Sequence, residues 1–387
     1  MIQSLKKIII IAPFNIFPPY WGGANRIYNL TKELANENKI WLLCNDYKQV
    51  SKEDSRCAEL EELSSNPNIE IFFVKTRGKT SQIFNFSVIK KGLEIIKKEK
   101  PDFILAEFVW SGLHAIILNL LTKTPYILDE HNVEFIRFDR MNRGNKFSRK
   151  MLRFYEKLSC TRASKILAVS NIDSDFLVSK LGIKKDRIAI IPNGFDTKKF
   201  HPDENKVPEI KDQLNLGKGP IILFFGKLDY TPNYEAVKII RNEILPRILK
   251  KIPDTKFLII GDNPPSEFTH KNIVFTGMVD KIEDFINTSD VVISPLLSGG
   301  GTRLKILEAI ACGKVVVSTT VGAEGIDQSQ IKDFLKISDD WEEFSKEILS
   351  AISRKPSNVP HEFVQKYSWA QVSEKVNQVL NSTDKGV

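Results

Sequence analysis

Short apolar segments alternate with amphipathic segments along almost the whole sequence, and this alternation restricts the fold more than any other feature. The apolar segments are rich in Ile, Val, Leu and Phe, as buried parallel strands are. The segments between them repeat apolar residues every three or four positions, which is typical of helices packed on a sheet. The predicted strands of the first half are 8–12, 40–44, 69–74, 102–108, 126–129, 166–169 and 188–191. Those of the second half are 221–225, 256–260, 273–275, 291–294 and 315–318.

The alternation lapses in a polar, proline-containing stretch at 201–219, where we place the linker between two domains. We therefore predict an α/β protein with two doubly wound, Rossmann-like domains, 1–203 and 204–367. A C-terminal helix, 368–387, is expected to join the first domain. With 387 residues, of which 42% are apolar, the chain is long enough for two cores. Because ligands bind at the carboxyl ends of parallel strands, the loops of both domains should face a shared cleft.

A glycine-rich loop after the predicted strand 291–294 has the features of a phosphate-binding loop. Its residues are Ser298, Gly299, Gly300, Gly301 and Thr302. A helix is predicted directly behind it, over 302–312. Glycine lets the main chain approach a ligand closely, and a helix N-terminus presents N–H groups and the positive end of a dipole. We therefore expect a bound anion at this loop.

Charged side chains in the predicted helix support this interpretation. Arg303 and Lys305 lie in its first turn, where an isolated helix would favour acidic residues, so their position favours a bound anion. Glu308 lies about two turns into the helix and can accept hydrogen bonds from sugar hydroxyls. Together these residues suit a nucleoside diphosphate. The structural alternative is a glycine-rich turn followed by a solvated basic helix face, because glycine-rich loops alone are weak signals.

Composition narrows the class of protein only in part. The excess of 56 Lys and Arg over 48 acidic residues is compatible with phosphorylated ligands, nucleic acid or an anionic membrane. The four cysteines are far apart in the sequence and form no C-x-x-C pair, so we predict neither structural zinc nor a disulfide framework. This cysteine usage indicates a reducing compartment. No segment reaches the roughly 18 apolar residues of a membrane-spanning helix, so we expect a soluble or peripheral protein.

Several motifs, in their order and spacing, resemble the family 4 glycosyltransferases of the GT-B fold. They are Pro19-Tyr-Trp-Gly-Gly23, Asp129-Glu-His-Asn132, Val169-Ser170, Ile191-Pro-Asn-Gly-Phe-Asp196, Phe225-Gly-Lys227 and Gly301-Thr-Arg-Leu-Lys-Ile-Leu-Glu-Ala309. The likeness extends over nearly the whole chain. It implies retaining transfer of a sugar from a nucleoside diphosphate donor, without a metal or another cofactor. The donor would be held mainly by the C-terminal domain and the acceptor mainly by the N-terminal one.

The resemblance also assigns roles to five side chains. Glu308 would bind the donor ribose. Lys227, Arg303 and Lys305 would neutralise the diphosphate as the nucleotide leaves. His131 would lie near the transferred sugar, where its ring can hydrogen-bond a hydroxyl or shield the reacting carbon.

Main-chain groups complete the expected donor site. The amides of Gly22 and Gly23 would close over the diphosphate, and the base would lie near Gly277 and Met278. The full set of expected donor contacts besides the five side chains is Gly22, Gly23, Gly226, Gly277, Met278, Ser298, Gly299, Gly300, Gly301 and Thr302.

The sequence departs from the family pattern at two positions. Many members have two glutamates eight residues apart, and the first of these positions is Gly300 here. Many members also pair the basic residue at Lys227 with a lysine about six residues later, where this chain has Asn233. A subgroup with the loop Gly-Gly-Gly-Thr-Arg-Leu-Lys supplies that charge from Arg303 and Lys305 instead.

Asp173-Ser-Asp175 has the D-x-D spacing of metal-dependent glycosyltransferases. The pattern falls at the start of a predicted helix, however, where acidic residues complement the helix dipole. We therefore do not predict a metal site there.

The segment from Arg137 to Lys157 is predicted to include a basic amphipathic helix. It contains eight Lys or Arg residues against two acidic ones. Its apolar residues recur at helical spacing at Phe147, Met151, Phe154, Tyr155 and Leu158. One interpretation is an ordinary domain helix with this stripe in the core and its charges in solvent. The other is a docking surface for an anionic membrane that carries a lipid-linked acceptor.

Together with the resemblance, these observations predict a cytoplasmic glycosyltransferase that builds a surface polysaccharide or glycolipid. Whether it is also peripheral on the inner face of the membrane stays open. Its partners would be a nucleotide-sugar donor and a saccharide or lipid-linked acceptor. Nucleic acid is not an expected partner, because the basic segment has its aromatic residues on one helix face. Two alternatives stay open: a sugar-nucleotide epimerase or phosphorylase of the same fold, and a catalytically silent sugar-nucleotide-binding protein.

Overall fold

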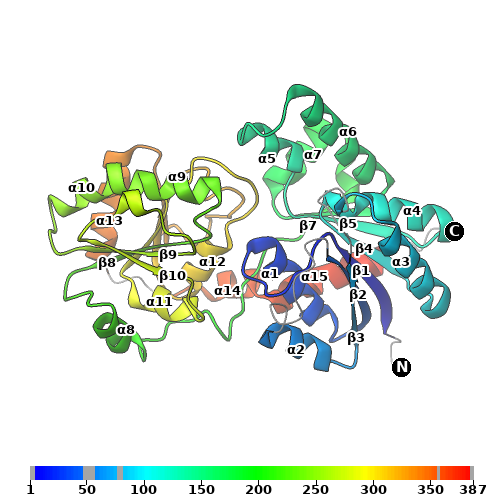
Figure 1. Cartoon of the computed structure of the whole chain (residues 1–387), viewed down its shortest axis with the longest axis horizontal. Helices are drawn as coiled ribbons and strands as arrows, with labels where there is room; N and C mark the ends of the chain where they lie inside the picture. Colours follow the sequence, from blue (N-terminus) through cyan, green and yellow to red (C-terminus); the bar gives the residue numbers. More distant parts are fainter. Residues whose placement is uncertain (1–4, 47–56, 76–81, 355–357, 384–387) are drawn as a thin grey trace. The chain divides into compact units, whose positions relative to one another are not determined.

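The computed structural model describes residues 5–46, 57–75, 82–354 and 358–383. The chain forms two compact units, Met1–Asn193 with Trp369–Val387 and Gly194–Ser368. Each unit is α/β, with one parallel sheet between layers of helices (Figure 1). The second unit begins at Gly194 and not at the predicted residue 204, because Phe195 and Phe200 belong to its core. The end of the predicted C-terminal helix, 384–387, lies outside the described residues.

The sheet of the first unit has the order β3-β2-β1-β4-β5-β6-β7, and all its strand pairs are parallel. Its strands are β1 (Lys6–Ala12), β2 (Asn38–Asp46), β3 (Ile69–Lys75), β4 (Phe103–Glu107), β5 (Tyr126–Glu130), β6 (Lys165–Ala168) and β7 (Ile188–Ile190). The strand order changes direction between β1 and β4. Loops at such a switch point diverge and leave room for a ligand at the carboxyl edge of the sheet.

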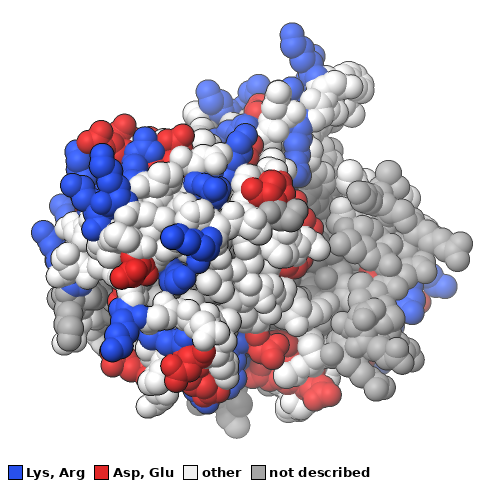
Figure 2. All heavy atoms as spheres, turned by 60° about the vertical axis from the view of Figure 1, so that its left-hand side comes forward, with Lys and Arg blue, Asp and Glu red and all other residues white. Residues whose placement is uncertain are grey.

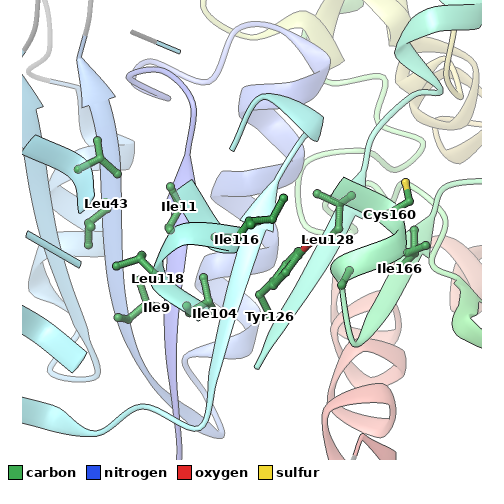
Figure 3. Packing of buried hydrophobic residues seen from close by; sticks show 14 of the residues in the cluster. Ile9, Ile11, Leu43, Ile104, Ile116, Leu118, Tyr126, Leu128, Cys160 and Ile166 are labelled. Atoms are coloured by element: carbon green, nitrogen blue, oxygen red, sulfur yellow. The ribbon is translucent and has the colours of Figure 1, made fainter. Parts of the chain in front are cut away.

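Helices cover both faces of this sheet. They are α1 (Gly22–Leu34), α2 (Ala58–Ser65), α3 (Phe86–Glu99), α4 (Gly112–Thr122), α5 (Glu134–Arg140), α6 (Lys146–Arg162), α7 (Asn171–Leu181) and α15 (Trp369–Ser382). On one face, apolar side chains of the central strands meet those of α4 and α6 (Figure 3). On the other, α15 packs on α1, and Asn377 accepts a 2.9 Å hydrogen bond from the Asn38 amide. The end of the described chain therefore belongs to the first unit.

The second unit has a parallel sheet of order β10-β9-β8-β11-β12-β13. Its strands are β8 (Ile221–Phe225), β9 (Lys256–Ile260), β10 (Ile273–Gly277), β11 (Val291–Ser294), β12 (Val315–Ser318) and β13 (Leu335–Ile337). Its helices are α8 (Val207–Gln213), α9 (Thr231–Ile239), α10 (Leu245–Leu249), α11 (Ile282–Thr288), α12 (Leu304–Ala311), α13 (Trp341–Ile352) and α14 (His361–Tyr367). One core lies under α9, α10 and α13, and the other lies under α11, α12 and α14. The switch point falls between β8 and β11.

Two details of the second unit differ from the predicted elements. The single helix predicted over 233–250 contains a π-helical turn, Ile240–Ile244, just before Pro246. Proline has no N–H to donate and its ring crowds the preceding turn, which interrupts the regular hydrogen-bond ladder. Strand β13 was not predicted from the sequence, because three residues are too few to show a periodic pattern.

The net charge of +8 is distributed over the surface. Figure 2 shows a face on which Lys and Arg side chains are more widespread than Asp and Glu and are mixed with them. Among the helices that the structure describes, none is long and apolar enough to cross a membrane.

Candidate active site

In the first unit, polar side chains gather at the carboxyl ends of β4 and β5. Glu107 is the last residue of β4 and lies opposite Asp129 in the register of the two strands. His131 follows β5 directly, and its Nε2 lies 2.7 Å from a carboxyl oxygen of Glu107. All three side chains are buried. The sequence predicted His131 at this edge, but Glu107 was missed because nothing local marks a strand-end glutamate as paired.

Arg26 of α1 reaches into the same cluster and is fully buried. Its guanidinium donates to both carboxylate oxygens of Asp129, at 2.8 and 2.9 Å. It also donates to the Pro192 carbonyl at 3.0 Å and to the Asn193 side chain at 3.1 Å. A buried, forked pair of this kind joins α1, β5 and the chain after β7. Sequence reasoning missed Arg26, although its partner Asp129 lies in a motif that had been singled out.

Burial sets the protonation of this cluster. It lowers the pKa of His131 to about 3, against the opposing charge of Asp129, so the ring is neutral at physiological pH. Burial, together with the charge of Asp129, raises the pKa of Glu107 well above its ordinary value. In its protonated form, Glu107 would donate to Nε2 of His131 and leave the proton of the ring on Nδ1. Nδ1 is buried and has no hydrogen-bond partner among the described residues.

The arrangement of Glu107, Asp129 and His131 also resembles a metal site, since one ligand atom of each lies within 4.8 Å of the others. Arg26, however, binds both oxygens of Asp129 and already supplies the positive charge that a cation would bring. We therefore assign this cluster to an arginine-centred network. At the other acidic pattern, Asp173 binds the hydroxyl of the helix cap Ser170, and Asp175 pairs with Lys185 at 3.1 Å.

An aromatic cluster covers His131. The ring of Phe108 lies 3.7 Å from the His131 ring, centre to centre, and also contacts Phe14 and Trp21. Phe108 has φ 58° and ψ 157°, a conformation that is strained for any residue with a side chain. Strain of this kind concentrates at functional sites. The cluster was not predicted.

Gly22 and Gly23 begin α1 beside this aromatic cluster. A Cβ on Gly23 would collide with the rings of Phe108 and Trp21, so a side chain there would require these rings to shift. The Phe108 ring therefore lies beside both Gly23 and His131. The expected contact of these two amides with a diphosphate stays a prediction.

In the second unit, two loops meet at the switch point between β8 and β11. Gly226 follows β8 with φ 146°, and a Cβ there would come within 3.0 Å of the side chains of Asn233 and Lys305. Asn233 donates to the carbonyl of Lys227 at 2.8 Å, and Lys305 Nζ lies 3.4 Å from its amide oxygen. Asn233 therefore connects the loop after β8 to the first turn of α12. The Lys227 side chain is exposed and pairs with Asp229 at 3.3 Å.

Lys305 is held in an unusual environment for an ammonium group. Its Nζ lies 4.4 Å from the centre of the Phe224 ring and 5.7 Å from that of Phe225. Burial and the nearby charge of Arg303 lower its pKa to about 7, against the opposing effect of Glu308. Perturbed pKa values of this size concentrate at functional sites, and a bound anion would restore the charge of Lys305. Its expected contact with a diphosphate stays a prediction.

Glu308 lies one turn after Lys305 and is only 8% exposed. Burial raises its pKa to about 7, against the attraction of Lys305. In the part of the chain that the structure describes, no group donates a hydrogen bond to its carboxyl. A buried acceptor without a donor fits a ligand that brings hydroxyl groups.

Arg303 lies in the glycine-rich loop and not in the helix, because α12 begins at Leu304 and not at the predicted Thr302. Its guanidinium donates to the carbonyls of Ser298, Gly300 and Gly301. Gly299 and Gly301 have φ values of 113° and 72°, which glycine tolerates best. Arg303 therefore stabilises the conformation of the glycine-rich loop. Its expected contact with a diphosphate stays a prediction.

Gly277 and Met278 lie at the end of β10, at the far side of the same sheet. Gly277 has φ 76°, its carbonyl accepts from the Gly261 amide at 3.1 Å, and Met278 is exposed. The structure brings Gly226, Lys227 and Lys305 together around Asn233. It does not bring Gly277 or Met278 into contact with them.

Two family models match this chain, Glycosyltransferase Family 4 over residues 21–199 and Glycosyl transferases group 1 over residues 219–354. An uncharacterized 44.6 kDa protein in the cps region of Klebsiella pneumoniae is 25% identical over 89% of this chain and 91% of its own length. An Escherichia coli UDP-Gal:α-D-GlcNAc-diphosphoundecaprenol α-1,3-galactosyltransferase is 26% identical over 76% of this chain and 77% of its own.

The fold is that of solved GT-B enzymes. The crystal structure of Anabaena HepE in complex with UDP-glucose matches with a TM-score of 0.75 and 15% identity, covering 97% of this chain and 99% of that one. Each of the two family models matches mainly residues in one of the two doubly wound units, so the sequence matches agree with the fold. This chain belongs to the family 4 glycosyltransferases of the GT-B fold.

Proposed function

We propose that the protein is a retaining glycosyltransferase that moves a sugar from a nucleoside diphosphate to a hydroxyl acceptor during the synthesis of a surface polysaccharide or glycolipid. The observation that carries this proposal is the arrangement of Lys305 and Glu308 on one helix at the switch point of the second unit. An ammonium with a lowered pKa and a buried carboxyl without a donor suit a diphosphate and its ribose.

The proposed reaction is driven by stabilisation of the leaving group. The bond between the anomeric carbon and the diphosphate oxygen breaks, and its electrons go to the diphosphate. The acceptor oxygen forms the new bond to the same face of the sugar, and its proton passes to the departing diphosphate. Lys227, Arg303 and Lys305 offer the positive charge that this step requires, so no metal or other cofactor is invoked.

In the first unit, His131 is proposed to donate from Nδ1 to a hydroxyl of the transferred sugar. A neutral ring with Glu107 on Nε2 has its proton on the correct nitrogen for this role. Phe108 covers the ring, so its side chain is proposed to turn aside when the sugar binds. The amides of Gly22 and Gly23 are proposed to contact the diphosphate.

The relatives support a lipid-linked acceptor. The E. coli relative is named for transfer to GlcNAc-diphosphoundecaprenol, and the Klebsiella relative lies in a cps region. The Anabaena structure contains UDP-glucose, which supports a UDP-sugar as the donor. The four cysteines are free thiols, a state that the reducing cytoplasm maintains. We therefore place the reaction at the cytoplasmic face of the membrane.

A transfer assay tests this proposal. Purified protein is incubated with UDP-Gal, UDP-Glc or UDP-GlcNAc and a GlcNAc-diphospholipid, and product is detected by mass spectrometry and UDP release. Transfer that is lost in Glu308→Gln and kept in the exposed control Lys238→Met is the expected result. An α-anomer in the product, seen by NMR, would establish retention.

The same assay separates the alternatives. An epimerase would convert the donor into an isomer with no acceptor present, and a phosphorylase would release sugar phosphate only with added phosphate. A silent binding protein would bind UDP and turn over nothing. Any of these results in place of transfer would contradict the proposal.

A further inference from the structure

The apolar residues of α6 divide between two sides of the helix. Leu152 and Cys160 are buried, and the Tyr155 hydroxyl accepts from the Leu113 amide at 3.1 Å. The residues Phe147, Met151 and Phe154 are instead 72%, 51% and 64% exposed. An ordinary domain helix with its whole apolar stripe in the core is therefore the wrong interpretation for this helix.

The exposed residues form a continuous apolar row. Phe147, Met151 and Phe154 are spaced by four and three residues and therefore lie on one face of the helix. Isolated exposed apolar side chains are common on soluble proteins, but a contiguous row of large ones usually marks an interaction surface. None of the described residues covers this row.

Lysines border the row. Lys146, Lys150 and Lys157 are exposed, and none of them has an acidic partner in the part of the chain that the structure describes. Lys150 lies four residues before Phe154 and Lys157 three residues after it, so both lie beside this ring on the helix surface. Long lysine side chains in such positions can direct their ammonium groups towards lipid phosphates while apolar neighbours enter the bilayer.

The acidic residue of α6 does not offset these charges. Glu156 is fully buried, where its two carboxylate oxygens accept from the amides of Glu134 and Phe135 at 2.7 and 2.9 Å. The exposed side of α6 therefore combines an apolar row with uncompensated positive charge. The net charge of the chain, +8, acts in the same direction.

We propose that this face of α6, defined by Phe147, Met151, Phe154 and the lysines Lys146, Lys150 and Lys157, docks on the surface of an anionic lipid bilayer. The apolar row enters the headgroup boundary, and the lysines meet the lipid phosphates. A second copy of the chain is a poorer occupant, because a two-fold contact would bring like charges together. Docking requires no sugar transfer, so it goes beyond the proposed reaction and can fail independently of it.

Vesicle flotation tests the proposal with full-length protein. Binding is compared on vesicles that contain phosphatidylglycerol and on vesicles of phosphatidylcholine alone. One variant carries Phe147→Ser, Met151→Ser and Phe154→Ser, and a second carries Lys146→Gln, Lys150→Gln and Lys157→Gln. Two controls lie on other elements. One is the single variant Phe86→Ser, whose side chain is 69% exposed, and the other is the matched triple variant Lys90→Gln, Lys97→Gln and Lys123→Gln.

The wild-type protein should bind the anionic vesicles at least about tenfold more tightly than the neutral ones, and added salt should weaken this binding. Each lysine replaced on α6 should weaken it by about fivefold. The serine variant should lose binding to both kinds of vesicle, and the controls should bind as the wild type does. Circular dichroism and UDP binding of every variant report whether it is folded.

Three results would overturn the proposal. The first is equal binding of the wild type to both kinds of vesicle, or none to either. The second is vesicle binding that the α6 variants and the controls reduce equally. The third is a dimer in sedimentation equilibrium that the serine variant dissociates while vesicle binding is absent, since a second copy would then occupy the face.

Discussion

Replacing Lys305 with methionine should stabilise the second unit and at the same time weaken nucleotide binding. Methionine keeps much of the length of the side chain and can pack on the Phe224 ring, which the lysine contacts now. It removes only the charge that burial disfavours. If Lys305 served only the fold, its replacement would instead lower the free energy of unfolding.

The magnitude follows from the pKa of Lys305, which falls from 10.5 to about 7. One pKa unit corresponds to about 1.4 kcal/mol, so the ammonium costs roughly 4 kcal/mol at pH 7. This is an upper value, because the Lys305 side chain is only partly buried. The variant loses a long hydrogen bond to Asn233, worth roughly 0.5–1 kcal/mol. After allowance for relaxation around the site, we expect a gain of about 1–3 kcal/mol in the free energy of unfolding, or roughly 2–4 °C per kcal/mol.

The pH dependence of the free energy of unfolding tests independently whether the charge of Lys305 destabilises the folded protein. Between pH 7 and the unfolded value of 10.5, the unfolded lysine binds a proton that the folded one does not. The cost of burial therefore shrinks as the pH rises through this range, and the advantage of the methionine variant should shrink with it. Differential scanning calorimetry over this range, without ligand, measures the effect.

UDP affinity, measured by isothermal titration calorimetry, should fall about 10- to 150-fold in the same variant, because a charge-assisted contact is worth roughly 1.5–3 kcal/mol. The exposed Lys238→Met serves as the control and should change neither property. A Lys305→Met protein that is less stable and binds UDP as well as the wild type would refute the reasoning.

Three further predictions concern both units. Arg26→Met should lower the free energy of unfolding by about 3–5 kcal/mol, measured by urea denaturation, because it leaves Asp129 charged and buried; unchanged stability would contradict the buried pair. Gly23→Ala should lower transfer activity and melting temperature, because its Cβ collides with Phe108; wild-type behaviour in both assays would show that the aromatic cluster is not tightly packed. UDP affinity should fall by up to about tenfold per pH unit between about pH 7 and 9, because Lys305 loses its proton in this range. In titration calorimetry, Lys305→Arg should abolish this pH dependence, since arginine stays charged. A pH dependence that persists in the variant would show that another group causes it.

The fold was largely predictable from the sequence, because parallel strands buried on both faces are nearly continuous apolar runs. Ile8–Ala12 and Ile221–Phe225 are such runs, and both became central strands. The boundary between the units was less predictable. Phe195 and Phe200 follow the last strand of the first unit directly but pack in the second, and only tertiary contact reveals this.

The candidate site was proposed where local chemistry marks it. Glycines, basic residues and a glutamate at fixed spacing indicated an anion site, and this assignment stays a prediction. In the structure, Lys305 and Glu308 lie one turn apart on α12, and burial shifts the pKa of both to about 7. The network around His131 was not predictable in the same way. Arg26 and Asp129 are 103 residues apart, and the partner of His131 depends on the register between β4 and β5.

The amphipathic helix α6 shows a different limit of sequence reasoning. Its periodicity correctly predicted a helix. Phe154 and Tyr155 belong to the same apolar pattern, yet Phe154 is exposed and Tyr155 is covered. Which of them is covered depends on α4, whose Leu113 amide binds the Tyr155 hydroxyl. The period of a pattern gives the face of a helix, and the neighbouring element decides how much of it is buried.

The measurement that tests the central claim most directly is a thermal-shift screen of the purified protein against UDP, GDP, ADP, dTDP and CMP, with Glu308→Ala and Lys305→Ala beside the wild type. A ligand at about a hundredfold excess over its dissociation constant stabilises the folded protein by roughly 2.7 kcal/mol, which raises the melting temperature measurably. We predict a shift with one nucleotide that both substitutions clearly reduce. No shift with any of them, or a shift that both variants keep, would contradict a nucleotide-sugar site at the start of α12.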